Sequence, residues 1–258
     1  MRFYSSCESW VVLYGGGEKR FASLAALSDS GVNVVAVLLP SSSSGGLRSL
    51  VGTLFRGQAV AIMDSSTSGL DDDLSAFEAS GILSIGWPSI LTRERLAAHP
   101  LAINVHPTLL PKYKGPNSGA YVILNGEDYS GSTIHIMEAD IDSGAILAQN
   151  RVELTPFDTV TSVQRKVYAE EPALLVDTLG RLSGGLDVVE QKSDEGSAYP
   201  RRRPSDSIID PNRPLIDLML EIRASNPDSF PAYFYYMGEK VTVHVKRLEK
   251  GDEEHDMV

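Results

Sequence analysis

The chain has 258 residues, of which 42% are hydrophobic and 22% are charged, and its formal net charge is −11. This length and composition are typical of one globular α/β domain with a small appendage. The acidic balance argues against a nucleic-acid partner, because proteins neutralise phosphates with Lys and Arg.

The single cysteine, Cys7, excludes an intramolecular disulfide and a zinc site built from several cysteines. No apolar run reaches the ~18 residues that span a membrane. Residues 1–10 also lack the apolar core of a signal peptide. We therefore expect a cytoplasmic protein with no membrane partner.

Short apolar runs alternate with helical patterns over the first 100 residues. Val34–Leu39 is uninterrupted, as expected of a central parallel strand, and the PSSSSGG run after it predicts a flexible loop. Altogether we expect strands at 10–14, 34–39, 58–63 and 82–87, and helices at 21–27, 71–79 and 92–98. This alternation predicts a doubly wound, mostly parallel sheet.

Three consecutive glycines, Gly15 to Gly17, separate the first strand from the first helix. Such a turn suggests a phosphate site, but the Gly-Lys-Ser/Thr ending of a P-loop is absent and the pattern is not GxGxxG. A tight strand-to-helix turn is the favoured interpretation.

A strand pattern near the middle of the chain carries an amide and an imidazole. Leu101–His106 reads as a strand that stops before Pro107. Asn104 and His106 share one face of it, because side chains two apart point the same way. In an open α/β sheet, ligands bind at the carboxyl ends of the strands, so we expect both side chains to face a ligand.

A carboxylate follows the next strand pattern. Ser132–Glu138 reads as that strand, and the loop after it carries Asp140 and Asp142. An amide, an imidazole and a carboxylate are then expected to converge on one crevice, a set suited to acyl transfer onto an amine. His135 lies on the same face as Thr133, and we interpret it mainly as packing beneath the site, with a direct role left open.

Five motifs follow one another along this part of the chain. They are NVHP at 104–107, LLPKYKG at 109–115, TIH at 133–135, DSG at 142–144 and ILAQ at 146–149. Together they resemble the signature of the folate-dependent formyltransferase family, and the match runs without a gap from about Gly86 to Gln149. That family includes glycinamide ribonucleotide transformylase, methionyl-tRNA formyltransferase and the sugar N-formyltransferases. The resemblance implies a Rossmann-like formyltransferase fold, a 10-formyltetrahydrofolate donor and a primary-amine acceptor, with no metal.

The resemblance assigns the catalytic roles to Asn104, His106 and Asp142. His106 would donate a proton to the departing folate nitrogen, while Asn104 would hydrogen-bond the developing oxyanion. Asp142 would orient His106 and raise its pKa, or accept a proton through water from the attacking amine. An ordinary Asp-Ser-Gly turn is the alternative role of Asp142.

The resemblance also marks contacts to the donor and the acceptor. Apolar walls with backbone donors and acceptors suit the flat pterin ring of the donor, although the first of the two segments also fits an ordinary strand–loop–helix joint. The expected donor contacts are Trp87, Pro88, Ser89, Ile90 and Leu91, and Met137, Glu138, Ala139, Asp140 and Ile141. The expected acceptor contacts are Lys114, Asn117, Tyr121, Arg201 and Arg223, of which the charged ones also fit a solvated surface.

The last third of the chain predicts one long helix and a small appendage. Asp158 is expected to cap a helix over 159–182, which Pro172 should kink or restart. A helix over 215–224 and alternating segments at 232–237 and 240–247 predict a helix plus a β-hairpin. We expect a catalytic domain at 1–183, an α+β subdomain at 184–248 and a flexible acidic tail at 249–258. The hairpin offers an edge for a homodimer.

The region after the long helix guides the choice of acceptor. It is too short for the C-terminal barrel of methionyl-tRNA formyltransferases, and the net charge has the wrong sign for tRNA. The segments IRA at 222–224 and FPA at 230–232 resemble sugar-nucleotide N-formyltransferases. We therefore predict formylation of a nucleotide-linked amino dideoxysugar for an O-antigen or another surface polysaccharide. The alternatives are another small amine, methionyl-tRNA or glycinamide ribonucleotide, and a catalytically silent folate-binding module.

Overall fold

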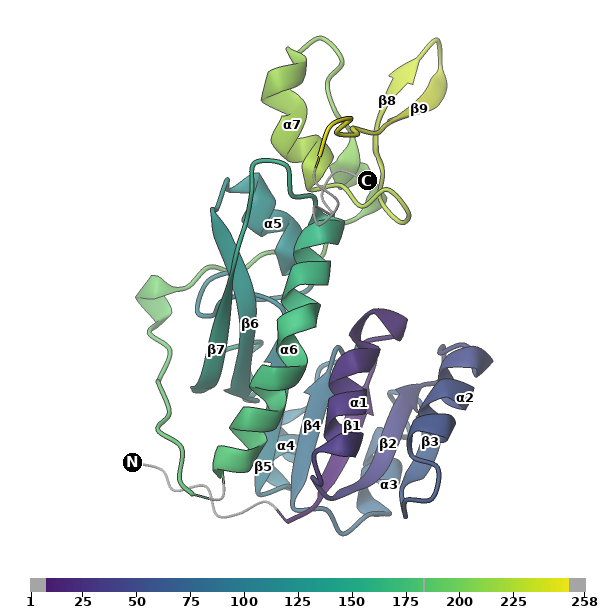
Figure 1. Ribbon diagram of the computed structural model, residues 1–258, viewed down its shortest axis with the longest axis vertical. Helices are drawn as coiled ribbons and strands as arrows, with labels where there is room; N and C mark the ends of the chain where they lie inside the picture. Colours follow the sequence, from purple (N-terminus) through teal and green to yellow (C-terminus); the bar gives the residue numbers. More distant parts are fainter. Residues whose placement is uncertain (1–7, 183, 251–258) are drawn as a thin grey trace.

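A seven-stranded sheet forms the body of the computed structural model, which describes residues 8–182 and 184–250 (Figure 1). The strand order is β3-β2-β1-β4-β5-β6-β7. Strands β1 to β5 run parallel to one another, whereas β6 and β7 join the sheet antiparallel to their neighbours. The strands are β1 (Trp10–Tyr14), β2 (Val34–Pro40), β3 (Ala61–Ser65), β4 (Gly81–Ile85), β5 (Leu101–His106), β6 (Tyr129–Ile136) and β7 (Ile146–Glu153). The predicted doubly wound, mostly parallel sheet is confirmed.

Helices cover both faces of the sheet. Leu24 of α1, Val51 of α2 and Leu175 of α6 pack in the apolar layer on one face, and Leu70 and Leu74 of α3 pack on the other. Burying one such side chain stabilises the fold by about 1.5–3 kcal/mol. The helices of the main body are α1 (Phe21–Asp29), α2 (Gly45–Leu54), α3 (Leu70–Ser75), α4 (Arg93–Ala97), α5 (Ser118–Leu124) and α6 (Val160–Leu182).

Two expectations for the first third of the chain were wrong. The run PSSSSGG is not entirely loop, because α2 begins at Gly45 and the Oγ of Ser44 accepts a hydrogen bond from the Leu47 amide. Serine is a strong N-cap residue, so the serine run starts a helix. The third strand lies at Ala61–Ser65 rather than 58–63.

Helix α6 is continuous through Pro172 and does not restart there. Both halves are anchored, since Val163 and Val167 pack with α5 while Leu175 and Leu179 pack on the sheet. This packing holds the helix together although proline supplies no amide hydrogen. The predicted cap was also one residue too early. The Oγ1 of Thr159 accepts from the Ser162 amide, and Asp158 instead accepts from the Ser162 hydroxyl.

The chain beyond α6 first follows the main sheet and then forms a small unit. Leu186 belongs to the main core, and the backbone of Val189 pairs with Ile146. The unit consists of α7 (Leu215–Arg223) and the antiparallel hairpin of β8 (Ala232–Tyr236) and β9 (Glu239–Val243), with Leu218 and Ile222 in its own core. The hairpin is as predicted. The domain boundary at 184 stays a prediction, and residues 251–258 of the expected acidic tail lie outside the described part.

Candidate active site

Strand β5 brings the amide and the imidazole to one edge of the sheet. It pairs in parallel with β4 and antiparallel with β6, where Asn104 lies opposite His135 and His106 opposite Thr133. Its alternate residues Ile103 and Val105 are buried in the main core. Asn104 and His106 therefore point to the other side, at the carboxyl end of the parallel strands, as predicted.

The loop after β6 delivers the carboxylate of Asp142. Asp142 has φ +51°, a left-handed conformation that Asp tolerates better than most residues. The side-chain amide of Gln191 donates to the carbonyls of Asp142 and Gly144, and a Cβ on Gly144 would overlap the Ile136 carbonyl. The loop is thus fixed on both sides, and it needs glycine at position 144.

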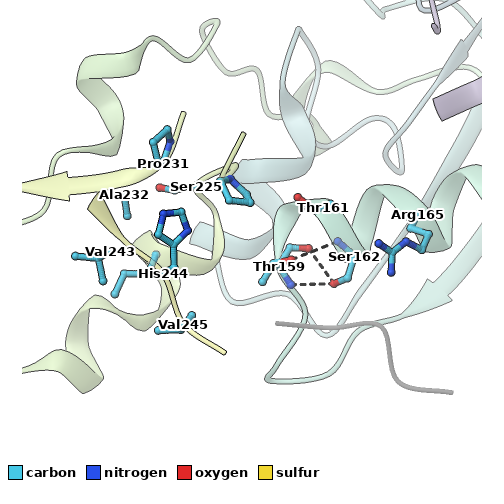
Figure 2. Close-up of a pocket in the computed structure, with 12 residues that line it drawn as sticks. Thr159, Thr161, Ser162, Arg165, Ser225, Pro231, Ala232, Val243, His244 and Val245 are labelled. Atoms are coloured by element: carbon cyan, nitrogen blue, oxygen red, sulfur yellow. Dashed lines mark hydrogen bonds between the residues drawn. The ribbon is translucent and has the colours of Figure 1, made fainter. Parts of the chain in front are cut away.

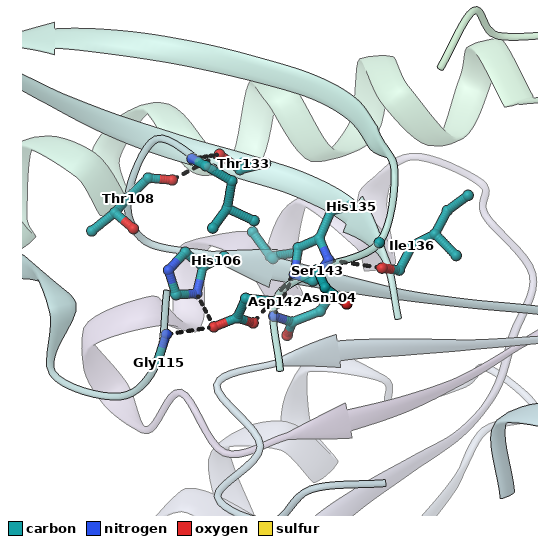
Figure 3. A network of polar contacts seen from close by, with 12 residues as sticks. Asn104, His106, Thr108, Gly115, Thr133, His135, Ile136, Asp142 and Ser143 are labelled. Atoms are coloured by element: carbon teal, nitrogen blue, oxygen red, sulfur yellow. Dashed lines mark hydrogen bonds and ion pairs between the residues drawn. The ribbon is translucent and has the colours of Figure 1, made fainter. Parts of the chain in front are cut away.

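Asp142 lies between two imidazoles (Figure 3). Its Oδ2 is 3.4 Å from Nδ1 of His106 and accepts a hydrogen bond of 2.8 Å from the Gly115 amide. Its Oδ1 is 3.5 Å from Nε2 of His135. The Nδ2 of Asn104 lies 3.1 Å from the same His135 nitrogen. The three predicted catalytic residues therefore form one network, and His135 is its fourth member.

The partners of each histidine fix its proton positions. Nε2 of His106 lies 3.0 Å from the Tyr113 carbonyl, and Nδ1 of His135 lies 2.8 Å from the Ile136 carbonyl. A carbonyl only accepts, so each of these nitrogens carries hydrogen. The other nitrogen of each ring, Nδ1 of His106 and Nε2 of His135, faces the Asp142 carboxylate.

Burial and charge act against each other in this network. Burial lowers the pKa of His106, and the carboxylate of Asp142 offsets this only in part. The expected rise in the His106 pKa was wrong, because the ring is only 5% exposed and burial outweighs the charge. Burial alone would raise the pKa of Asp142, but hydrogen bonds and charge from His135, His106 and the Gly115 amide lower it below its usual range. Burial and the neighbouring carboxylate thus act on the pKa of His106 in opposite directions, and burial is the larger effect.

A cavity of about 740 Å³ opens over this network. It is large enough for more than one small molecule or for one extended ligand. All of the expected donor contacts line it except Ala139 and Asp140. The backbone carbonyl of Asp140 instead accepts a hydrogen bond from the Ser143 hydroxyl. The expected donor contacts that line it are Trp87, Pro88, Ser89, Ile90, Leu91, Met137, Glu138 and Ile141.

The donor end of the cavity fits a flat heterocycle. Ile90 and Ile141 expose 62% and 49% of their surface, which provides apolar walls. The indole Nε1 of Trp87 is buried and has no hydrogen-bond partner among the described residues. A buried donor of this kind calls for an acceptor. The residues present therefore fit the pterin group that the resemblance implies.

The expected acceptor contacts divide into two groups. Asn117 and Arg201 line the cavity, whereas Lys114, Tyr121 and Arg223 are outside its lining. The Tyr121 hydroxyl donates to the Pro200 carbonyl, and the Lys114 backbone pairs with residues 197–199. Arg223 donates to the carbonyls of residues 155 and 158, which ties α7 to the start of α6. The side chains of Tyr121 and Arg223, and the backbone of Lys114, thus support neighbouring segments.

Several cavity residues were missed or undervalued in the sequence. His135 was interpreted mainly as packing, although its place on the Thr133 face of β6 already indicated the site. Gly15, Gly16, Arg20 and Tyr168 also line the cavity. The tight turn at Gly15 was expected, since a Cβ there would overlap the Gly86 carbonyl, but its place in the cavity wall was not. No local signal links Arg20 or Tyr168 to the catalytic strand.

A smaller cavity of about 70 Å³ lies between the start of α6 and the hairpin unit (Figure 2). Its lining includes Thr159, Ser162 and His244, and it shares no residue with the large cavity. Among residues 8–182 and 184–250, no three His, Cys, Asp or Glu side chains are grouped to hold a metal ion. Nor is any helix in that part of the chain long and apolar enough to span a membrane.

The sequence matches the family model described as formyl transferase over residues 10–179. It is 32% identical over 205 residues to a methionyl-tRNA formyltransferase of Borreliella burgdorferi (strain ZS7), which covers 75% of this chain and 65% of the relative. The match thus spans 65% of the length of this relative, and the same share of its counterpart from a second strain of the species.

Two solved structures share the fold over almost the whole chain. A 4-N formyltransferase from Francisella tularensis has a TM-score of 0.77 at 22% identity, and covers 95% of this chain and 100% of its own. A sugar N-formyltransferase from Shewanella sp FDAARGOS_354 has a TM-score of 0.76 at 22% identity, over 94% and 99%. The resemblance read from the motifs is confirmed, and the chain belongs to the formyl transferase family.

Proposed function

We propose that the protein transfers the formyl group of 10-formyltetrahydrofolate to the primary amine of a nucleotide-linked amino dideoxysugar. The observation that carries the proposal is the network of Asn104, His106 and Asp142 beneath one cavity of about 740 Å³. The amide is suited to a developing oxyanion, and the histidine–carboxylate pair is suited to proton transfer.

The quality of the fold match supports a sugar acceptor. The 4-N formyltransferase and the sugar N-formyltransferase match 95% and 94% of this chain with TM-scores of 0.77 and 0.76, whereas a methionyl-tRNA formyltransferase from Clostridium thermocellum, which covers 90% of this chain, has a TM-score of 0.64. The methionyl-tRNA relative extends well beyond the match. A net charge of −11 also opposes tRNA binding. The proposed setting is the cytoplasm, where nucleotide sugars for a surface polysaccharide such as O-antigen are modified.

The proposed mechanism uses the network as it stands. The bound folate supplies an electrophilic formyl carbon. Asn104 gives one amide hydrogen to His135 and has the other to stabilise negative charge on the formyl oxygen. Nδ1 of His106 accepts a proton from the attacking amine, Asp142 stabilises the imidazolium, and His106 returns the proton to the leaving folate nitrogen. The cavity would bring the amine close to the formyl carbon, which lowers the barrier to attack.

An acceptor panel tests this proposal. Purified protein and 10-formyltetrahydrofolate are mixed with 3- and 4-amino dideoxysugar nucleotides, and mass spectrometry reads formyl gain. Formylation of one nucleotide sugar is the expected result and names the acceptor. No product with any sugar, with the donor intact, contradicts it.

Methionyl-tRNA is the second candidate acceptor, because the curated relative at 32% identity carries that activity in its name. The same assay with charged initiator tRNA in place of the sugars separates the two. Formylated methionyl-tRNA with no sugar product would replace the sugar proposal. Glycinamide ribonucleotide and simple amines complete the panel.

A further inference from the structure

A buried ion pair lies behind the catalytic strand, in a part of the chain that the proposed mechanism does not use. Arg20 follows the glycine turn after β1, and Glu171 lies in the middle of α6, 151 residues away. Arg20 is 4% exposed and Glu171 is fully buried. Burying two charges carries a large desolvation cost, and an apolar pair of the same shape is often as stable. The pair therefore calls for a role other than stability.

Arg20 joins the ion pair to β5 by a hydrogen bond. Arg20 contacts both carboxylate oxygens of Glu171, Nε with Oε1 at 2.9 Å and Nη2 with Oε2 at 2.6 Å. The Ser23 hydroxyl donates to the same carboxylate at 2.7 Å. Nη2 of Arg20 also donates to the carbonyl of Val105 at 3.0 Å. A guanidinium has a rigid fork of donors, so the carboxylate fixes the direction of the bond to Val105.

Val105 is the residue between the two catalytic side chains of β5. The Met137 amide donates to the Ala102 carbonyl. Backbone groups alternate in direction along an antiparallel pair, so Ala102, Asn104 and His106 bond toward β6, and Val105 points toward β4. Arg20 reaches this carbonyl at the end of β4, beside Gly86. A turn of the Val105 peptide would move both Asn104 and His106.

We infer that Arg20 and Glu171 are positioning residues, which hold the end of β5 so that Asn104 and His106 keep their geometry in the cavity. The contact acts through the backbone, and Arg20 also forms part of the cavity wall with Tyr168, whose ring centroid lies 5.2 Å from its guanidinium carbon. Misplacing a catalytic group by about 1 Å costs roughly 100-fold in rate. This inference rests on the proposed formyl transfer.

Two variants separate positioning from simple stability. Arg20→Lys keeps the charge but loses the fork, so it cannot hold Glu171 with two bonds and also direct Val105. The double variant Arg20→Met with Glu171→Leu removes both charges and leaves no unpaired carboxylate, so it should fold. For both we expect kcat to fall at least tenfold with the donor KM changed less than twofold. The double variant should keep its Tm within a few degrees.

The matched control is Arg213→Lys. Arg213 likewise bonds a carboxylate, that of Glu221, and a backbone carbonyl, that of Asp217, but it lies in the hairpin unit. We expect its kcat to stay within twofold of the wild type. If the two Arg20 variants also keep kcat within twofold, or lose kcat only in proportion to Tm, the inference is overturned.

A second readout is independent of activity. The side-chain nitrogen resonances of His106, recorded by NMR, should shift in the double Arg20 and Glu171 variant and stay unchanged in Arg213→Lys. Unchanged His106 resonances in the double variant overturn the inference even if no substrate is known. Shifted resonances in a protein that formylates no amine would instead refute the proposed function and leave the positioning role standing.

Discussion

His106 has an acceptor on each ring nitrogen, the Tyr113 carbonyl at Nε2 and the Asp142 carboxylate at Nδ1. Two acceptors favour a doubly protonated ring, whereas burial disfavours its charge. The surroundings of the ring therefore place it to exchange a proton. In the proposed mechanism His106 acts first as a base and then as an acid within one turnover.

Removing either member of the pair should stop the reaction without emptying the cavity. We expect His106→Ala and Asp142→Asn each to lower kcat by about 100-fold or more, because proton transfer contributes roughly that much. Folate binding should persist, since the donor end of the cavity is formed by other residues. Single-turnover rates and a folate titration measure the two effects. Near-wild-type turnover in either variant contradicts the assignment.

Acid should destabilise the protein through the same two residues. Ordinary pKa values are about 3.9 for Asp and 6.5 for His, and folding lowers both. As the pH falls, the unfolded chain therefore takes up protons before the folded protein does. The contribution of His106 to the free energy of unfolding is lost as the pH falls below about 6.5, and that of Asp142 is lost below about 4. Urea unfolding from pH 7 to 5 should show a smaller loss in His106→Gln than in the wild type. Equal losses would refute this account of His106.

At the scale of elements, the glycine turn after β1 contacts the loop after β4, residues 86–91, which is expected to bind the donor. The Gly15 amide donates to the Ile85 carbonyl at 3.0 Å, and a Cβ at Gly15 would overlap Gly86 and touch Pro88. We expect Gly15→Ala to displace the loop and raise the donor KM about tenfold, with a smaller change in kcat. Gly119→Ala in α5 is the control, because its Cβ meets nothing within 4 Å. Similar donor KM values in the two variants would argue against this role.

Local patterns predicted the elements that make up most of the site. Strands β1 and β2 are continuous apolar runs, β5 alternates in polarity from Ile103 on, and the motif around Asn104, His106 and Asp142 lies within 39 residues that fold together. The features that local patterns did not predict depend on distant packing. Strand β7 pairs with β6, and the predicted helix α6 continues through Pro172 instead of restarting there, because both of its halves are anchored.

Long-range contacts are the other feature that could not be predicted from the sequence. The bond between Arg20 and Glu171 spans 151 residues, and neither residue has a motif around it. The lowered pKa of His106 also could not be predicted, because the sequence shows the carboxylate but not the burial that outweighs it. A motif can predict which charged groups lie close together, but the extent to which a group is buried, and so its pKa, can be predicted only from the complete fold.

At the scale of the molecule, the hairpin unit presents an exposed apolar tip. Tyr235, Tyr236 and Met237 expose 59%, 59% and 87% of their surface. We expect a homodimer through this hairpin, because an exposed apolar tip favours contact with another copy. Light scattering should give twice the chain mass, and Met237→Lys with Tyr235→Lys should give the monomer. A monomeric wild type contradicts the expectation.

The most direct test of the whole account follows an isotope-labelled formyl group from 10-formyltetrahydrofolate. The account predicts that wild-type protein moves the label onto the amine of a nucleotide sugar and that Asp142→Asn, folded and still binding folate, does not. Label that remains on the donor with every amine offered, or that is released only as formate, would contradict it.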